Sequence, residues 1–255
     1  MAKATDLGKI FAGIEKQLHR QTAKALTATA KSAADAVVKE MTKVFDRPTP
    51  FALRGVFWRG ASVDQGRMYA QVYFKDFAFK GGNAAEFMRP QIEGGQRVPK
   101  RFEKALRRVG ILPAGMFAVP GRDAKRDAYG NMSRGQIVQL LAALQAFGEQ
   151  GYKANMSDKR RAQLARDKTS RKTGKVTKGF EYFVLHQARA GLLPGVYQKV
   201  QYGERAVPRI ILVFVRAPNY RKRLPFRSVV DGVVAREFAG HFRAAGSTSR
   251  TAAAA

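Results

Sequence analysis

Cysteine is absent from this chain of 255 residues, and histidine occurs only three times. Without cysteine the chain can form no disulfide, no thiolate nucleophile and no cysteine-based metal site. His19, His186 and His241 are far apart in the sequence and fall in different expected elements, so they do not predict a metal site. We therefore expect no metal ion and no cofactor.

Long apolar runs are also missing. No run approaches the roughly 18 residues that a transmembrane helix needs. The first nine residues lack the apolar region of a signal peptide. We therefore expect no membrane partner that the chain would span.

Acidic side chains are scarce: 19 Asp and Glu stand against 47 Lys and Arg, which leaves a formal net charge of +28. Such a charge destabilises the folded chain by self-repulsion and points to a polyanionic partner. Nucleic acid is the first candidate and an anionic membrane surface is the second. Solubility alone is the remaining interpretation.

The sequence offers no recognisable catalytic pattern. A Gly-x-Ser-x-Gly nucleophile turn does not occur, and the glycine pairs at 81–82 and 94–95 lack the following Lys-Ser/Thr of a phosphate loop. A metal-dependent nuclease would need converging acids, and no set is singled out by the spacing of Asp64, Asp76, Glu86, Glu93 and Glu181. We expect no catalytic residues, and a nuclease is the least supported alternative.

Residues 5–45 predict one long amphipathic helix. Apolar side chains recur every three or four residues from Phe11 to Val44, and Pro48 and Pro50 prevent its continuation. The helix would be roughly 60 Å long, whereas a compact globule of this chain length is about 45 Å across. Either the helix bends within its own core or it packs partly on another subunit. We favour the second, with Leu18, Leu26 and Met41 as candidates for the contact.

The remaining pattern mixes strands and helices. We expect strands at 51–58, 68–74, 116–119, 180–186, 195–200 and 209–215. We expect helices from Asn83 to Met88, at 99–109, from a Ser133 cap to Phe147, and at 226–244. The fold class is α+β, with the long N-terminal helix and the C-terminal helix packed on an antiparallel or mixed β-sheet, and with a basic inserted loop.

One globular domain is expected, in five parts. They are the long helix (1–48), a first α+β part of the core (49–151), a basic exposed insertion (152–178), the C-terminal strands and helix that complete the core (179–245), and a flexible tail (246–255).

The insertion at 152–178 carries ten Lys and Arg against two Asp, a net charge of +8, and almost no large apolar side chain. Such a segment cannot form a core of its own, so we expect an exposed loop with a short polar helix after Ser157. Its candidates for contacts with DNA phosphates are Lys159, Arg160, Arg161, Arg166, Lys168, Arg171 and Lys172. Contacts of this kind are independent of sequence and sensitive to salt. A solvated insertion without a specific partner is the alternative interpretation.

The order of these elements resembles the minor tail protein Z and tail-completion proteins of long-tailed phages. The resemblance is carried by the alanine-rich helix that ends in prolines, the hairpin after it, and two short segments near the end. These are Leu-Pro-Gly-Val-Tyr at 193–197, followed by an apolar strand, and Tyr-Arg-x-Arg-x-Pro-Phe at 220–226, followed by the closing helix. The basic insertion has no counterpart that we can place in this pattern.

The resemblance implies a structural virion protein without enzymatic activity, assembled in the host cytoplasm and located in the tail or neck. It implies a ring, commonly a hexamer in that family, that completes the tail around the DNA channel. Its partners would be the tail terminator or tube protein, the head–tail connector and double-stranded DNA in the lumen. The segment before the last helix supplies further assembly candidates: Tyr220, Arg221, Arg223, Pro225 and Phe226. The competing hypothesis is a sequence-independent double-stranded nucleic-acid-binding protein that is not part of a virion.

Overall fold

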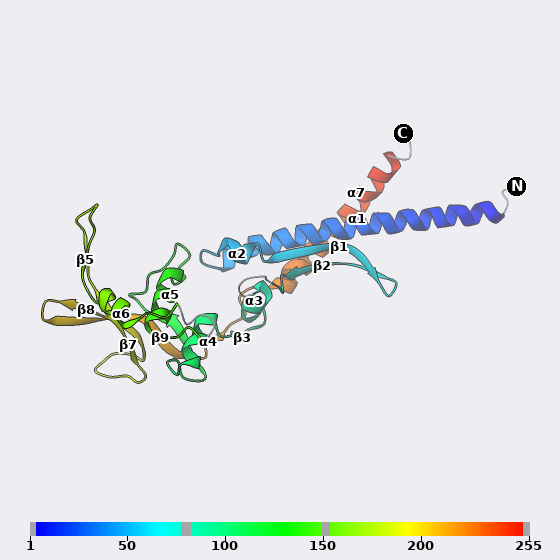
Figure 1. The fold of residues 1–255 in the computed structure, drawn as a ribbon. Helices are drawn as coiled ribbons and strands as arrows, with labels where there is room; N and C mark the ends of the chain where they lie inside the picture. The colour runs from blue at the N-terminus through cyan, green and yellow to red at the C-terminus, as the bar shows by residue number, and fades with distance from the viewer. Residues whose placement is uncertain (1–3, 78–82, 149–153, 252–255) are drawn as a thin grey trace. The chain divides into compact units, whose positions relative to one another are not determined.

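The computed structural model describes residues 4–77, 83–148 and 154–251, and it shows a mixed α+β chain (Figure 1). Its strands pair in antiparallel fashion throughout the ladders described below. The chain forms two compact units, whereas one globular domain was expected from the sequence. The first unit combines residues 1–94 with 220–255, and the second is residues 95–219.

The first unit is built on α1 (Ala4–Val44), the long helix that the apolar period predicts. After it, the chain does not enter a strand at Phe51 as expected. Thr49 accepts a hydrogen bond from the Ala52 amide (3.2 Å) and begins the short helix α2 (Pro50–Leu53). Proline is favoured at the first helical position, where its missing amide is not needed. A helix therefore begins at Pro50, although the aromatic residues that follow it resemble a strand.

A hairpin follows, formed by β1 (Val56–Asp64) and β2 (Arg67–Phe74). The strands are longer than predicted because the turn is only Gln65-Gly66, both with positive φ, between the paired residues Asp64 and Arg67. The hairpin lies along α1, where the Ala61 amide donates to Thr27 Oγ1 (2.9 Å).

Helix α3 (Ala84–Glu93) begins at Asn83, whose side chain accepts a hydrogen bond from the Glu86 amide (2.6 Å). It continues past Met88, so Pro90 lies inside the helix rather than ending it. Helix α7 runs from Phe226 to Thr251. The core between these elements contains a group of buried residues: Val37, Met41, Phe74, Ala84, Met88 and Leu224.

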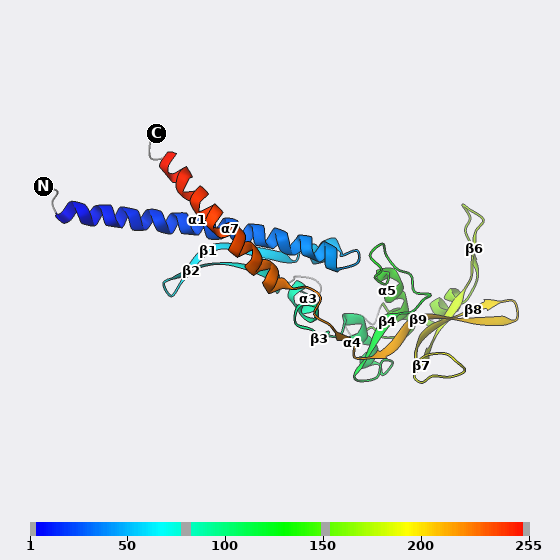
Figure 2. The same cartoon turned by 180° about the vertical axis from the view of Figure 1, so that it is seen from behind.

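Helix α7 crosses α1 (Figure 2). It packs on α1 over small side chains. On α1, Ala25, Ala33 and Thr29 are buried, and Thr29 Oγ1 lies 3.0 Å from His241 Nδ1.

The tail predicted from residue 246 is helical through Thr251, because Ala245 is buried and Gly246 lies directly against Gln21. Residues 252–255 lie outside the described part of the chain.

The second unit has a four-stranded antiparallel sheet in the order β4-β9-β8-β7. These strands are β4 (Met116–Pro120), β7 (Phe180–Leu185), β8 (Gly195–Tyr202) and β9 (Arg205–Arg216). Helices α4 (Arg101–Arg108) and α5 (Arg134–Ala143) pack on this sheet through Leu106, Leu140 and Leu141. The terminal helices therefore pack on the β1–β2 hairpin and on each other, while the larger sheet has its own two helices.

Two details of the second unit differ from expectation. Ser133 precedes α5 but its side chain makes no capping hydrogen bond, and the helix ends at Ala143 rather than at Phe147. Gln145 takes a positive φ, which turns the chain out of the helix. Two-residue strands, β3 (Gly95–Gln96) and β10 (Asn219–Tyr220), lie where the chain passes from one unit to the other.

Candidate nucleic-acid interface

The basic insertion contains a short polar helix, α6 (Asp158–Leu164). Ser157 caps it by accepting a hydrogen bond from the Arg160 amide (3.4 Å). Asp158 stands in the first turn, where a carboxylate is favourable, and pairs with Arg161. No side chain of α6 is buried. The short helix expected after Ser157 is therefore present and displays its cations to solvent.

After α6 the chain forms a small hairpin from β5 (Lys168–Thr169) and β6 (Val176–Thr177). Its turn is closed by backbone hydrogen bonds between Ser170 and Lys175 (3.0 Å) and between Gly174 and Ser170 (2.9 Å). The segment is therefore more ordered than the loop that its composition predicts. Arg171 and Lys172 lie at the tip, and every described residue from 166 to 178 is exposed.

Asp167 stabilises the base of this hairpin through hydrogen bonds. Its carboxylate accepts hydrogen bonds from Lys178 Nζ (2.6 Å) and from the Gly179 amide (2.9 Å), and these two bonds lower its pKa. Gly179 is buried, and a Cβ added there would lie 2.1 Å from the Ala165 carbonyl oxygen. Only glycine fits this close approach, so Gly179 fixes how the basic insertion joins the start of strand β7.

All seven candidates for phosphate contacts are exposed, as expected. Among them, Arg161 is engaged with Asp158 on the same helix. The other acid of the insertion, Asp167, is held by Lys178 and Gly179. The two negative charges of the insertion are thus neutralised locally, and the remaining cations face solvent. Side chains in this arrangement suit phosphate contacts, which position a duplex without reading its sequence.

The assembly candidates have different environments. Met41 is fully buried in the core of the first unit, so it is unavailable to another subunit. Leu26 is partly buried, whereas Leu18 on the same helix is 49% exposed. Phe226 packs on Phe74 at 5.5 Å between ring centroids, which makes it a core residue at the start of α7.

The basic segment before α7 also has an internal role. Arg223 donates from Nη2 to the Val44 carbonyl oxygen (2.9 Å) and lies over the Phe45 ring, so it satisfies a carbonyl at the end of α1. Tyr220 is partly buried, and Arg221 and Pro225 are exposed. Arg221 and Pro225 therefore stay available for contacts outside the chain, while Arg223 mainly joins α7 to α1.

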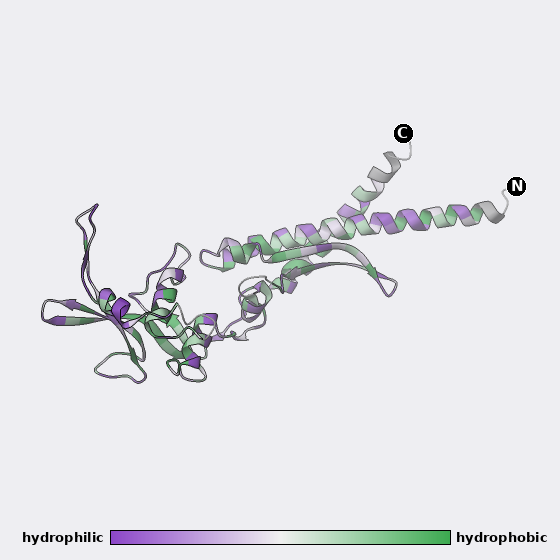
Figure 3. Ribbon diagram, in the orientation of Figure 1, coloured by the Kyte–Doolittle hydropathy of each residue, from purple (hydrophilic) through white to green (hydrophobic). Residues whose placement is uncertain are grey.

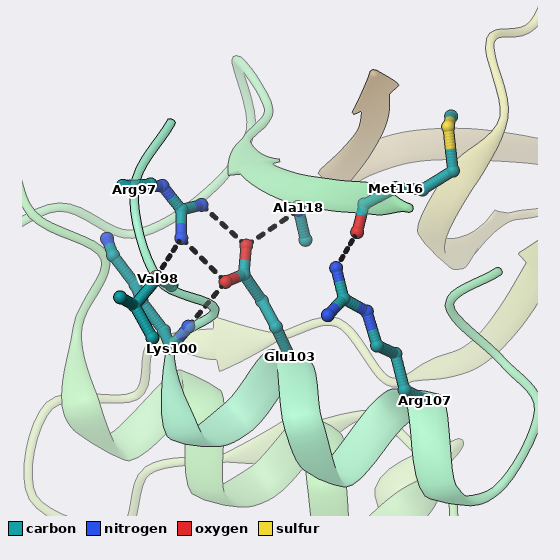
Figure 4. Close-up of polar contacts among 7 residues, drawn as sticks. All are labelled: Arg97, Val98, Lys100, Glu103, Arg107, Met116 and Ala118. Atoms are coloured by element: carbon teal, nitrogen blue, oxygen red, sulfur yellow. Dashed lines mark hydrogen bonds and ion pairs between the residues drawn. The ribbon is translucent and has the colours of Figure 1, made fainter. Parts of the chain in front are cut away.

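A buried ion pair in the second unit was not predicted from the sequence (Figure 4). The Glu103 side chain is fully buried in α4, and its carboxylate accepts hydrogen bonds from both Arg97 Nη atoms (2.6 and 2.7 Å). The backbone amides of Lys100 (2.6 Å) and Ala118 (2.8 Å) donate to the same carboxylate. A glutamate three residues after a helix start is the signal that could have found it.

This ion pair is structural rather than catalytic. Burial works to raise the pKa of Glu103, but the hydrogen bonds from Arg97, Ala118 and Lys100 outweigh burial and lower it. The carboxylate therefore stays ionised and has no free oxygen for a substrate. Arg97 and Arg107 both lie against the Phe117 ring, and Arg107 also donates to the Met116 carbonyl. The cluster joins α4 to strand β4.

The two histidines of the first unit, His19 and His241, have separate neighbours. His241 meets Thr29, and His19 lies 4.0 Å from Glu15 on the exposed part of α1. In the part of the chain that the structure describes, no three His, Asp or Glu side chains gather closely enough to hold a metal ion. None of the described helices combines the length and apolar character needed to cross a membrane.

Comparison with models of protein families, with curated proteins and with solved structures finds no match to this chain.

Proposed function

We propose that the chain is a structural protein of a tailed phage virion that completes the tail at the head–tail junction. Copies would form a ring around the DNA channel and join the tail terminator or tube protein to the head connector. The proposal includes no enzymatic activity. It would place the protein in the tail or neck of the virion after assembly in the host cytoplasm.

The observation that carries the DNA contact is the exposure of the seven candidate cations on a segment with a net charge of +8. Long α1 supports assembly, since residues 7–20 are exposed along their whole length and include large apolar side chains. The placement at the tail rests on the resemblance in the order of elements, from the proline-terminated helix to the segment at 220–226.

Removal of the gene from the phage would test this role. We expect heads and tails that fail to join, with the defect restored by supplying the protein in trans. Electron microscopy of the lysate would show the unjoined parts. Joined, infectious particles that lack the protein would refute the proposal.

The second candidate is a double-stranded nucleic-acid-binding protein outside any virion, which the net charge of +28 favours. It predicts the same salt-dependent duplex binding but no defect in particle assembly. Duplex binding by the isolated protein, combined with normal particles after gene removal, would favour this alternative.

A further inference from the structure

The apolar stripe of α1 changes character where the rest of the first unit stops covering it. Beneath α7 the stripe is made of small buried residues such as Ala25, Thr29 and Ala33. Before Gln21, which donates to the Phe242 carbonyl at 2.7 Å, the same stripe carries large exposed residues. They are Leu7 (49% exposed), Ile10 (56%), Phe11 (67%), Ile14 (55%) and Leu18 (49%).

The two halves follow one helical face. A helix turns by about 100° per residue, so Leu7, Leu18 and Ala25 point in nearly the same direction. The exposed part therefore continues the face that α7 covers further along α1, as the two helices diverge towards their free ends (Figure 2). Small residues allow the close approach of α7, while the large residues have no covering element among the described residues of this chain.

Charge is distributed to leave this face free of cations. Lys9, Lys16 and Arg20 lie on the opposite side of the helix, because they are offset from the stripe by about half a turn. The stripe is bordered instead by Gly8, Gln17 and the carboxylate of Glu15. In a chain of net charge +28, such a face is where a second copy can approach with the least repulsion. Figure 3 shows the alternation of hydrophilic and hydrophobic residues along α1.

We propose that residues 7–18 of α1 form a helix–helix interface whose occupant is the same segment of a second copy, running parallel. This deepens the proposed function, since it rests on the assembly of copies. Leu7, Phe11, Ile14 and Leu18 follow steps of four, three and four, the heptad spacing of interlocking helices. Ile10 adds a fifth large apolar side chain at the edge of this seam.

A lipid surface fits this face less well. Helices that lie in a membrane interface use Lys and Arg at the borders of the apolar face, where the long side chains reach the headgroups. Here the cations are centred on the far side of the helix. Binding to vesicles is therefore treated as a competing outcome of the test.

The first experiment compares the mass of the full chain in solution, by sedimentation velocity over a range of concentrations, with that of two double variants. Phe11→Gln/Ile14→Gln removes two of the five large apolar side chains of the stripe but keeps good helix formers. Ala12→Gln/His19→Gln places two glutamines on another exposed side of the same segment. We expect the stripe variant to raise the dissociation constant by about tenfold or more, and the control to leave it unchanged.

The absence of cysteine permits a second, geometric experiment. Ile14→Cys introduces a single thiol in the stripe, and Lys16→Cys introduces one on the opposite side. A disulfide needs Cα atoms within about 7 Å, so parallel segments in register should join copies through position 14 and not through position 16 under mild oxidation. Non-reducing electrophoresis would show the covalent dimer.

The outcomes separate this interface from the proposed function. An oligomer whose mass the stripe variant leaves unchanged, without a disulfide at position 14, overturns the interface and leaves the ring standing elsewhere on the surface. A monomer at all concentrations removes both. A monomer that binds vesicles of phosphatidylglycerol and phosphatidylcholine through the stripe overturns the interface in favour of a membrane contact. Association through the stripe in a chain that joins no heads to tails supports the interface and refutes the tail role.

Discussion

The β5–β6 hairpin offers the sharpest test of the proposed DNA contact. Lys168, Arg171 and Lys172 are exposed there, while the hairpin itself is held by backbone hydrogen bonds and by Asp167 at its base. Changing all three to glutamine removes three positive charges and keeps long polar side chains. We therefore expect the triple variant to fold normally and to bind duplex DNA more weakly.

The expected size follows from counterion release. If each of the seven exposed candidates neutralises one phosphate, the slope of log affinity against log salt is about −6. Between 50 and 200 mM salt the unmodified chain would then lose affinity by on the order of 10⁴-fold. With four cations left the slope falls to about −3.6, and the loss over the same range is only on the order of 10²-fold.

Fluorescence anisotropy with a labelled duplex of mixed sequence would measure both slopes. The matched control is Lys9→Gln/Lys16→Gln/Lys24→Gln, which removes the same charge from exposed positions on α1. We expect the control to keep the steep slope. Equal slopes for the two triple variants would refute the assignment, because net charge rather than the basic insertion would then govern binding.

Three further substitutions test the packing that supports these surfaces. Phe226→Ala should lower the free energy of unfolding by about 2 kcal/mol and reduce particle yield, because it removes the ring that packs on Phe74. The loss is smaller than for a fully buried phenylalanine, since Phe226 is only partly buried. Urea unfolding and plaque counts measure the two effects, and normal values for both would contradict the prediction. Gly179→Ala should displace the basic insertion and speed its proteolysis at 154–178, whereas an unchanged cleavage rate would show that the Ala165 carbonyl can move away. Glu103→Gln should cost about 3 kcal/mol, since it leaves Arg97 without its charged partner. Because the pKa of Glu103 is lowered in the folded chain, its stabilisation is fully present above the ordinary glutamate pKa and is lost as pH falls through the folded pKa. The difference in free energy of unfolding between the native chain and Glu103→Gln, measured in urea, should therefore shrink at acidic pH. A difference that stays constant with pH would argue against the ion pair.

Regular periods in the sequence were enough to predict the larger elements. The 3.6-residue period of α1 and the apolar run of β9 each identify their element without tertiary information. The short polar helix after Ser157 also follows from local chemistry, because a serine cap and an acidic first turn are both visible in the sequence.

The errors came from residues whose role depends on a distant contact. Small polar residues after Ala244 resemble a flexible tail, yet the helix continues because Ala245 and Gly246 pack against α1, more than two hundred residues away. Met41 and Leu18 share one stripe in the sequence, but only the structure shows that one is core and the other is exposed. The Arg97–Glu103 pair is equally invisible to periodicity, since its strength comes from burial against β4.

The separation of charge and apolar surface gives a physical reason for the proposed assembly. The second unit holds 25 Lys and Arg against 8 Asp and Glu, and its exposed insertion supplies contacts that are individually weak in physiological salt. The first unit carries the exposed apolar stripe, from which cations are excluded. Copies joined through the stripe would present several insertions to one duplex, so that each further contact forms at a high effective concentration. Self-association through α1 would thereby give tight, sequence-independent binding of duplex DNA from contacts that are weak one by one. Such binding suits a ring through which DNA passes.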